Sequence, residues 1–240
     1  MTMTTTDTRT AVRTATVNTS AFRSALEWVA PAFEKDRTLP ALSSIYLRIG
    51  PSDAHPGTYR ADWSRRMPKG AAITLAATDR YRLHWATVDI DVSEDVPRFD
   101  FMVPGAELLT AAKSWPKRTR GFAADLEQLA IDVPADALAA TFTARFLDVT
   151  ASSSLRLTDG TFPRFDSLMP WDFEGDADPV GHYSPTYLAQ MATAAAKVGT
   201  PKAAIHMRLR GVKPAAFAAT TADDNVAHYS AILMPIRVPS

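Results

Sequence analysis

The stretch "AITLAATDRYRLHWATVDI", residues 72–90, contains two runs typical of β-strands with a short polar turn between them. Both runs are rich in β-branched and aromatic residues, and Asp79, Arg80, Tyr81 and Arg82 separate them. Such a turn is compatible with a catalytic loop, a phosphate grip or the rim of a docking pocket. We interpret Asp79 as an acceptor that holds the turn, not as a catalyst.

An amphipathic helix is predicted upstream of these strands, over residues 18–33, "NTSAFRSALEWVAPAF". Phe22 and Leu26 belong to an apolar set with helical spacing, and Asn18 is one of three candidate N-cap residues. Pro31 is expected to end or bend this helix.

Two further helices are predicted, over residues 102–115 with Pro104 in the first turn and over residues 183–199 with Pro185 at the start. Each helix is introduced by a short strand-like run and followed by about three more. The runs that follow are residues 42–49, 72–78 and 82–90 after the first helix, 128–133, 138–146 and 154–160 after the second, and 204–210, 215–221 and 227–238 after the third.

This recurrence predicts an α+β fold of repeated βαβββ units, with antiparallel sheets covered on one face by helices. The predicted organisation is a flexible tail over residues 1–13, a domain of two units over 14–170, an acidic linker over 171–178 and a third unit over 179–240.

Composition limits the classes of function. The chain has no cysteine, which excludes disulfides and fits a reducing compartment. We expect neither a secretory leader nor a membrane span, because no long uninterrupted apolar run is present. The formal net charge is zero, but residues 179–222 carry five basic and no acidic residues, whereas residues 121–178 carry eleven acidic residues and three arginines. This segregation favours a protein that attracts a polyanion on one face, although random patchiness of the surface is the alternative.

Motifs of catalysis are missing from the sequence. It has no glycine-rich phosphate loop, no nucleophile elbow and no metal-binding spacing of its five histidines. Asp159 and Asp166 could form a carboxylate pair, but the phenylalanines and proline between them favour a packed turn. We therefore expect no enzyme activity, no metal and no cofactor.

A basic insertion, residues 50–72, interrupts the first unit. It is interpreted either as a mobile hairpin that contacts phosphates or as a plain solvated loop.

Five motifs occur in order along the chain: "TLPALSSIYL" (38–47), "ATDRYRL" (77–83), "VPGAELL" (103–109), "DGTFPRFDSLMP" (159–170) and "ILMPIRV" (232–238). Together they resemble the bacterial sliding clamp, the beta subunit of DNA polymerase III, over about residues 14–240. The first two units resemble the middle domain of that clamp, and the third resembles the second half of its C-terminal domain. Nothing corresponds to the remaining parts of the clamp, so the resemblance is to a compact version, such as a bacteriophage or another mobile element would encode.

The resemblance implies the DNA clamp fold and a processivity factor that encircles double-stranded DNA without sequence preference. It implies partners that dock through short peptides, namely a DNA polymerase and a clamp loader, and a cytoplasmic, nucleoid-associated location, in the host cytoplasm if the chain is phage-encoded. Family rings contain twelve βαβββ units, so four chains of three units would close one, although a dimer or an incomplete ring is also open. The alternative function is a clamp-like peptide-binding module or decoy that does not encircle DNA.

The resemblance also assigns residues to two surfaces. The helices would line the hole, and the basic residues expected to face DNA are Arg23, Lys113, Lys117, Arg118, Arg120, Lys197 and Lys202. The apolar peptide-binding pocket would comprise Leu42, Thr78, Arg80, Tyr81, Arg82, Leu83, Pro163, Ser167, Leu168, Ile232, Met234, Pro235, Ile236 and Arg237. Arg80 replaces a small residue of the family pattern and Ser167 replaces a longer basic one, so the shape of the pocket and the partner motif differ from the pattern.

Overall fold

The computed structural model describes residues 12–55, 58–59, 65–66, 68, 70–90, 96, 98–117, 126–136, 138–166, 181–198, 204–210, 213–219 and 227–236. The helices are α1 (Thr19–Val29), α2 (Gly105–Ser114) and α3 (Pro185–Val198), with short 3-10 turns at Ala30–Ala32 and Ser52–Ala54. The strands are β1 (Val12–Asn18), β2 (Ser44–Pro51), β3 (Thr58–Tyr59), β4 (Arg65–Arg66), β5 (Ala71–Thr78), β6 (Arg82–Asp89), β7 (Phe99–Pro104), β8 (Glu127–Pro134), β9 (Ala139–Phe146), β10 (Val149–Arg156), β11 (Ile205–Arg210), β12 (Lys213–Ala219) and β13 (Ala227–Leu233).

The stretch 72–90 forms the hairpin of β5 and β6 at the centre of a seven-stranded sheet, in the order β11-β12-β13-β6-β5-β2-β7. All the strand pairs in this sheet are antiparallel, and Thr78 stands opposite Leu83 where the hairpin turns. The turn needs a residue in the left-handed region, and Arg80 takes this conformation with φ of 79°. The predicted α+β class with antiparallel sheets is confirmed.

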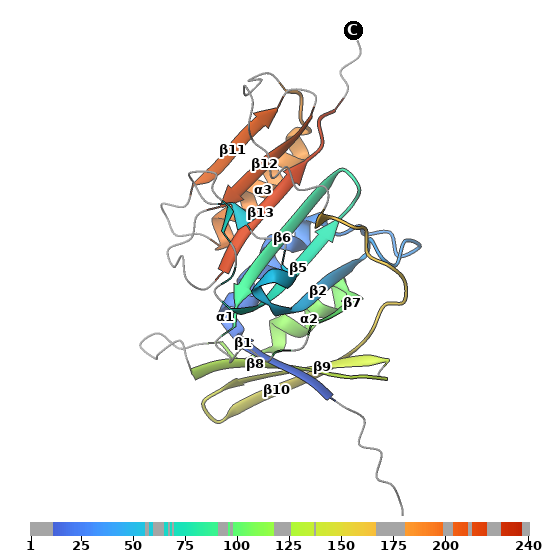
Figure 1. The fold of residues 1–240 in the computed structure, drawn as a ribbon, viewed down its shortest axis with the longest axis vertical. Helices are drawn as coiled ribbons and strands as arrows, with labels where there is room; N and C mark the ends of the chain where they lie inside the picture. Colours follow the sequence, from blue (N-terminus) through green and yellow to red (C-terminus); the bar gives the residue numbers. More distant parts are fainter. Residues whose placement is uncertain are drawn as a thin grey trace, which may run out of the picture.

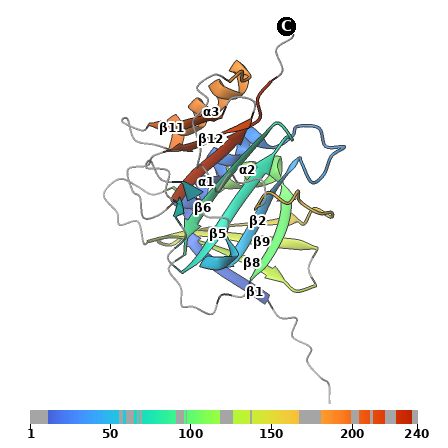
Figure 2. The same ribbon diagram turned by 45° about the horizontal axis from the view of Figure 1, so that its top comes forward.

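The first two units exchange strands. β1 precedes α1 but pairs with β8 in a four-stranded sheet, β1-β8-β9-β10, while β7 precedes α2 but pairs with β2 in the large sheet. Figures 1 and 2 show the small sheet at one end of the molecule with α2 between it and the large sheet. The exchange ties the two units into one body.

The third unit joins the first through β13, which pairs with β6 and places Ile232 opposite Leu83. Residues 181–184 form no strand before α3, and the residues that precede them, 167–180, lie outside the described part, so the strand predicted to introduce this helix stays a prediction. The strand predicted over residues 154–160 lies earlier in the chain: it is β10, Val149–Arg156, and residues 157–160 are outside it. The serine-rich start of β10 has low strand propensity, and its pairing with β9 determines its position.

The helix ends follow the expected chemistry. Asn18 caps α1, because its side-chain Oδ1 accepts a hydrogen bond of 2.9 Å from the N–H of Ala21. Pro31 lies in the 3-10 turn that ends this helix, and Pro185 is the first residue of α3. No helix in the described part of the chain is long and apolar enough to span a membrane.

The helices cover one face of the large sheet and define the main core. Phe22 of α1 packs against Trp115, after α2, and Phe142 of β9, with ring centroids 5.9 and 6.3 Å apart. Trp28 of α1 packs on Tyr229 of β13 and donates its indole N–H to the carbonyl of Ser230 at 3.0 Å. α1 therefore contacts all three units of the chain.

The opposite face of the large sheet carries a second buried cluster that includes Tyr46, Trp85, Phe162, Phe165 and Ile232. The hairpin of β3 and β4 contacts β12 and β13 and lies in front of them in Figure 1, whereas α3 lies behind. This part of the basic insertion is therefore on the face of the sheet away from the helices. The rest of the insertion lies largely outside the described residues.

Candidate functional site

The turn between β5 and β6 is held by Asp79. Its Oδ1 accepts hydrogen bonds from the N–H groups of Tyr81 (3.1 Å) and Arg82 (3.0 Å), and its Oδ2 accepts one from Nε of Arg82 (3.0 Å). Thr78 supports the same turn, since its hydroxyl donates to the carbonyl of Arg82 at 2.7 Å and accepts from the N–H of Arg80. The interpretation of Asp79 as a structural acceptor is confirmed.

Arg82 is buried, although the sequence resemblance placed it on the peptide pocket. Its guanidinium pairs with Asp79, donates to the side-chain oxygen of Gln190 and lies 4.3 Å from the ring centroid of Tyr187. Gln190 and Tyr187 belong to α3, so Arg82 connects the first unit to the third. The exposed arginine of this turn is Arg80.

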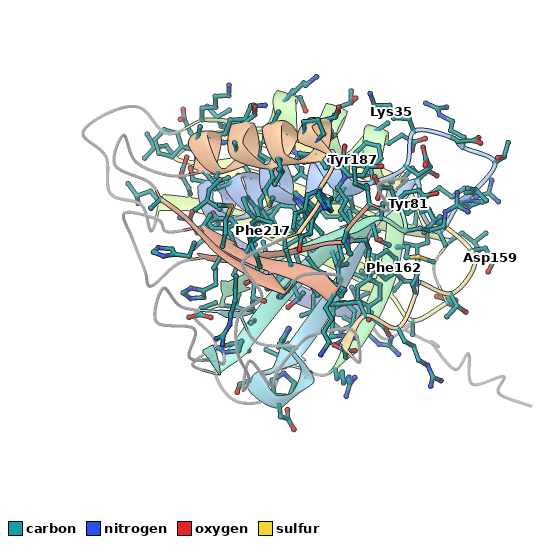
Figure 3. All side chains as sticks on the ribbon, turned by 90° about the horizontal axis from the view of Figure 1, so that it is seen from above. Lys35, Tyr81, Asp159, Phe162, Tyr187 and Phe217 are labelled. Atoms are coloured by element: carbon teal, nitrogen blue, oxygen red, sulfur yellow. The ribbon has the colours of Figure 1, made fainter. Side chains whose placement is uncertain are left out.

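Three of the predicted pocket residues form an exposed apolar patch, which we define as Tyr81, Met234 and Ile236. Their side chains are 59%, 42% and 46% exposed. The backbone joins two of them, because the N–H of Met234 donates to the carbonyl of Tyr81 at 2.8 Å, whereas the N–H of Ile236 donates to the carbonyl of His182. Pro235 is half-buried between the other two C-terminal members. Figure 3 shows Tyr81 on the same side of the molecule as Tyr187 and Phe162.

The remaining predicted pocket residues lie at different depths. Leu83 and Ile232 are buried beside each other in the second cluster, which also contains Phe162 and Phe165, the neighbours of exposed Pro163. Leu42 is buried, and its carbonyl accepts a hydrogen bond from the N–H of Glu34. Ser167, Leu168 and Arg237 lie outside the described residues.

An aromatic strap, residues 157–166, borders the same region; Pro163 was predicted as part of the pocket, but the aromatic residues Phe162 and Phe165 on either side of it were not. Phe162 stacks on Tyr46 of β2 with ring centroids 4.9 Å apart, and Phe165 meets both rings edge-on. Arg48 makes two hydrogen bonds of 2.9 Å to the carboxylate of Asp166. The sequence signal was the i, i+2 spacing of Tyr46 and Arg48, which places both on one face of a strand.

The strap and the strands β2 and β7 line a pocket of about 520 Å³ that opens to solvent. Tyr46 lines it and donates its hydroxyl to Asp100 at 2.7 Å; burial, followed by this acceptor, raises the pKa of Tyr46 to about 12. The two carboxylates considered as a catalytic pair differ in setting, since Asp166 pairs with Arg48 while Asp159 is exposed at the rim. Asp166 therefore has a structural partner in the strap.

The basic residues expected to face DNA are also of two kinds. Arg23 is half-buried, and its guanidinium donates to the carbonyls of Ala112, Trp115 and Pro116 at 3.2–3.4 Å, where it binds the C-terminal end of α2. The exposed members are Lys113, Lys117 and Lys197. Arg118, Arg120 and Lys202 lie outside the described residues.

The three helices together carry three basic and two acidic residues, a net charge of plus one. α1 and α3 lie side by side, and a hollow of about 430 Å³ between them is lined by Glu27, Gln190 and Lys197 among others. The helices themselves therefore contribute little net positive charge to this face.

The buried histidines have structural partners. His55 hydrogen-bonds Thr74 at 2.8 Å through Nδ1, and His84 hydrogen-bonds the carbonyl of Trp28 at 2.9 Å through Nδ1. Burial is the largest cause that lowers the pKa of each imidazole to about 4. Across the described residues, no three metal-ligating side chains converge as a metal site would require.

Comparison with known proteins gave matches to solved structures alone: no protein-family model and no curated protein sequence matches this chain. The DNA polymerase sliding clamp from Bacillus subtilis aligns with a TM-score of 0.61 and 15% identity, covering 94% of this chain and 64% of the clamp. The DNA polymerase III beta subunit from Thermotoga maritima aligns with a TM-score of 0.63 and 14% identity, covering 99% of this chain and 68% of the subunit.

The sliding clamp from Pseudomonas aeruginosa bound to griselimycin aligns with a TM-score of 0.66 and 13% identity, covering 99% of this chain and 68% of that one. The chain thus has the sliding-clamp fold and spans about two thirds of the length of these clamps. The resemblance predicted from five sequence motifs is confirmed at the level of the fold.

Proposed function

From the sliding-clamp fold of this chain, we propose that it is a DNA polymerase sliding clamp, a processivity factor that encircles duplex DNA and tethers replication proteins. The observation that carries the proposal is the structural match over 94–99% of the chain, with α1 and α3 side by side on one face of the large sheet. On this proposal the protein catalyses no reaction itself, requires no cofactor and works in the cytoplasm, in the host cytoplasm if a phage encodes it.

DNA binding would be sequence-independent, because long basic side chains at phosphate distance neutralise the backbone without reading bases. Lys113, Lys117 and Lys197 are exposed on or next to α2 and α3. Arg118, Arg120 and Lys202 would add to them from the flanking segments. The weak charge of the helices themselves favours loose, exchangeable contacts, which suit sliding.

Partner peptides would dock on the exposed apolar patch of Tyr81, Met234 and Ile236. Short extended peptides with Leu or Phe anchors need apolar surface of this kind, and an unbranched methionine adapts to different anchors. Arg80 is exposed beside the patch and suits acidic groups or carbonyls of the peptide. Thr78 and Arg82 would act indirectly, because both are buried and fix the turn that presents Tyr81.

A second candidate function is a clamp-like module that binds such peptides without encircling DNA. One observation favours it: the net charge of only plus one on the three helices. A decoy of this kind would compete with host clamps for their partners.

A threading experiment separates the two functions without a loader. Linear duplex DNA is incubated with the protein, both ends are then blocked with bulky caps, and retention is measured during a high-salt wash. A clamp stays on the capped DNA and leaves when a restriction enzyme reopens an end. A peptide-binding module washes off the DNA whether its ends are capped or open.

Peptide docking is tested separately by titrating labelled peptides that carry Leu and Phe anchors. We expect the double variant Tyr81→Ala, Met234→Ala to bind about tenfold or more weakly, since each anchor contact is worth about 1 kcal/mol or more. The matched control is Leu138→Ala, an exposed apolar residue in the β8–β9 turn. Equal binding by both proteins would place the peptide site elsewhere.

A further inference from the structure

The β5–β6 turn, which presents Tyr81 of the exposed apolar patch, is attached to helix α3. Arg82 follows Tyr81 directly in the chain. Its guanidinium donates to the side-chain oxygen of Gln190 and lies 4.3 Å from the ring centroid of Tyr187. Both partners belong to α3, whereas Asp79 holds the same guanidinium from within the turn. The position of α3 therefore bears directly on the conformation of the turn.

A second contact joins the patch to the segment that leads into α3. The N–H of Ile236 donates to the carbonyl of His182 at 2.8 Å, and the helix begins three residues after His182, at Pro185. Met234, the other C-terminal member of the patch, is bonded to Tyr81 instead. The backbone of the patch is therefore held partly by the β5–β6 turn and partly by the segment that continues into α3.

Helix α3 itself has a small apolar anchor. Of its fourteen residues it buries Met191, Ala194 and Ala195, and its larger apolar side chains other than Met191 are only partly buried. By contrast, α1 buries seven of its eleven residues, among them Phe22 and Trp28. Apolar burial stabilises in proportion to its area, and segments with few buried contacts open at a low free energy. The core therefore holds α3 more loosely than α1.

The contact between α3 and α1 also leaves free space. A hollow of about 430 Å³ lies between the two helices, with Glu27 on the α1 side and Gln190, Thr193 and Lys197 on the α3 side. Close-packed protein interiors contain few voids larger than a water molecule, so α3 has room to shift against α1 here. Gln190 and Lys197 are seven residues apart, about two helical turns, and so lie on one face of α3. The helix face that contacts Arg82 thus also carries a basic residue proposed to face DNA.

We propose that α3 couples DNA binding to peptide binding. A phosphate contact at Lys197 fixes the helix. Gln190 then holds Arg82, and with it the turn that presents Tyr81. Without DNA, the helix shifts over the hollow and the turn loses this support part of the time. Conformational freedom that is lost when DNA binds does not have to be lost again when a peptide docks, so each ligand strengthens the binding of the other.

This inference rests on the proposed clamp function and adds a regulation to it: partner peptides bind more tightly to a clamp that holds DNA than to a free one. Gln190 and Tyr187 act as positioning residues, because they reach the peptide site through Arg82. Coupling between two binding sites commonly corresponds to a factor of about 5–150 in affinity, and the factor is the same in both directions. For one hydrogen bond and one ring contact we expect the lower end, about fivefold.

Hydrogen exchange tests the link between the patch and α3 in the absence of DNA. A saturating peptide with Leu and Phe anchors should slow amide exchange in α3 by about fivefold and leave exchange in α2 unchanged. Gln190→Met removes the acceptor for Arg82 and should weaken this protection, whereas Gln190→Glu keeps an acceptor and should retain it. The matched control is Thr193→Ala, which lines the same hollow and loses only a hydroxyl that donates to the carbonyl of Ala189 within the helix. The proposal is overturned if a bound peptide leaves α3 exchange unchanged in the parent protein, or protects α3 equally in Gln190→Met.

Peptide affinity with and without DNA tests the coupling itself. The labelled peptide is titrated against the free protein and against the protein held on capped duplex DNA. We expect the parent protein and Thr193→Ala to bind the peptide about fivefold more tightly on DNA. Gln190→Met should lose most of this difference, and Gln190→Glu should recover it. Equal affinities of the parent protein on and off DNA would contradict the coupling.

The two experiments separate failure of the coupling from failure of the proposed function. A parent protein that stays on capped DNA and binds the peptide with one affinity in both states would keep the clamp function and lose the coupling. A parent protein that is lost from capped DNA would refute the clamp function and the effect of DNA together, and the exchange experiment would still establish or refute the link between the patch and α3.

Discussion

The sharpest prediction concerns Arg82, because the structure buries this side chain in an ion pair, whereas Arg80, two residues earlier, is exposed. Arg82→Ala would leave the carboxylate of Asp79 buried without its ionic partner. Breaking a buried pair costs about 3–5 kcal/mol, and the two backbone N–H groups that remain on Asp79 favour the lower value, about 3 kcal/mol. Loss of the cation–π contact with Tyr187 adds about 1 kcal/mol.

The sum, about 4 kcal/mol, corresponds to a fall of about 8–16 °C in Tm for a chain of this size. Urea unfolding followed by tryptophan fluorescence and calorimetry would measure it, and Arg80→Ala is the matched control because Arg80 is exposed. We expect Arg80→Ala to change the free energy of unfolding by less than about 0.5 kcal/mol. Hydrogen exchange in Arg82→Ala should rise first in α3 and β13, which this residue connects to the first unit. The reasoning is refuted if the two variants have equal stability.

Three further predictions concern other parts of the fold. Neutral His55 and His84 contribute fully to the free energy of unfolding above about pH 6.5. Because burial lowers the pKa of each to about 4, up to about 3 kcal/mol per histidine is lost as the pH falls from 6.5 to 4. His84→Gln should therefore weaken the dependence of the free energy of unfolding on pH in this range. Asp166→Asn should cost about 1 kcal/mol, since its side chain is half exposed, and should raise hydrogen exchange within residues 157–166 while α2 is unaffected. Gly105→Ala would bring a Cβ to 3.0 Å from the ring of Phe33, so we expect a loss of about 1–3 kcal/mol in chemical denaturation, whereas Ala106→Ser on the exposed side of α2 should be neutral.

The local parts of this fold were predictable from the sequence. Asn18, Pro31 and Pro185 mark helix ends by chemistry that acts within a few residues, and they lie where that chemistry requires. The hairpin of β5 and β6 followed from two β-rich runs around a turn. β10 was misplaced because a run of serines has no strong preference, and its strand conformation comes from the neighbouring β9.

Long-range features could not be read from the sequence. The exchange of β1 and β7 and the pairing of β13 with β6 depend on contacts between residues far apart in the chain, for which a single sequence carries no local signal. The candidate site shows the same division between features that were predictable from the sequence and features that depend on long-range contacts. Tyr81 and Met234 were placed correctly as neighbours through the resemblance, but the burial of Arg82 depends on Gln190 and Tyr187, more than a hundred residues away.

The pairing of β6 with β13 also determines when the chain can complete its large sheet during synthesis on the ribosome. Trp28 and its acceptor Ser230 are separated by 202 positions, and β6 lacks one neighbour until β13 has been made. At about 5–20 residues per second, the interval between the two strands lasts on the order of ten seconds. During this time the nascent protein presents to the cell an unpaired strand edge and the apolar side chains, Trp28 among them, that β13 covers in the complete fold. A chaperone that recognises extended apolar segments would bind in this interval, and a chain that stalls before residue 227 would be a substrate for proteolysis.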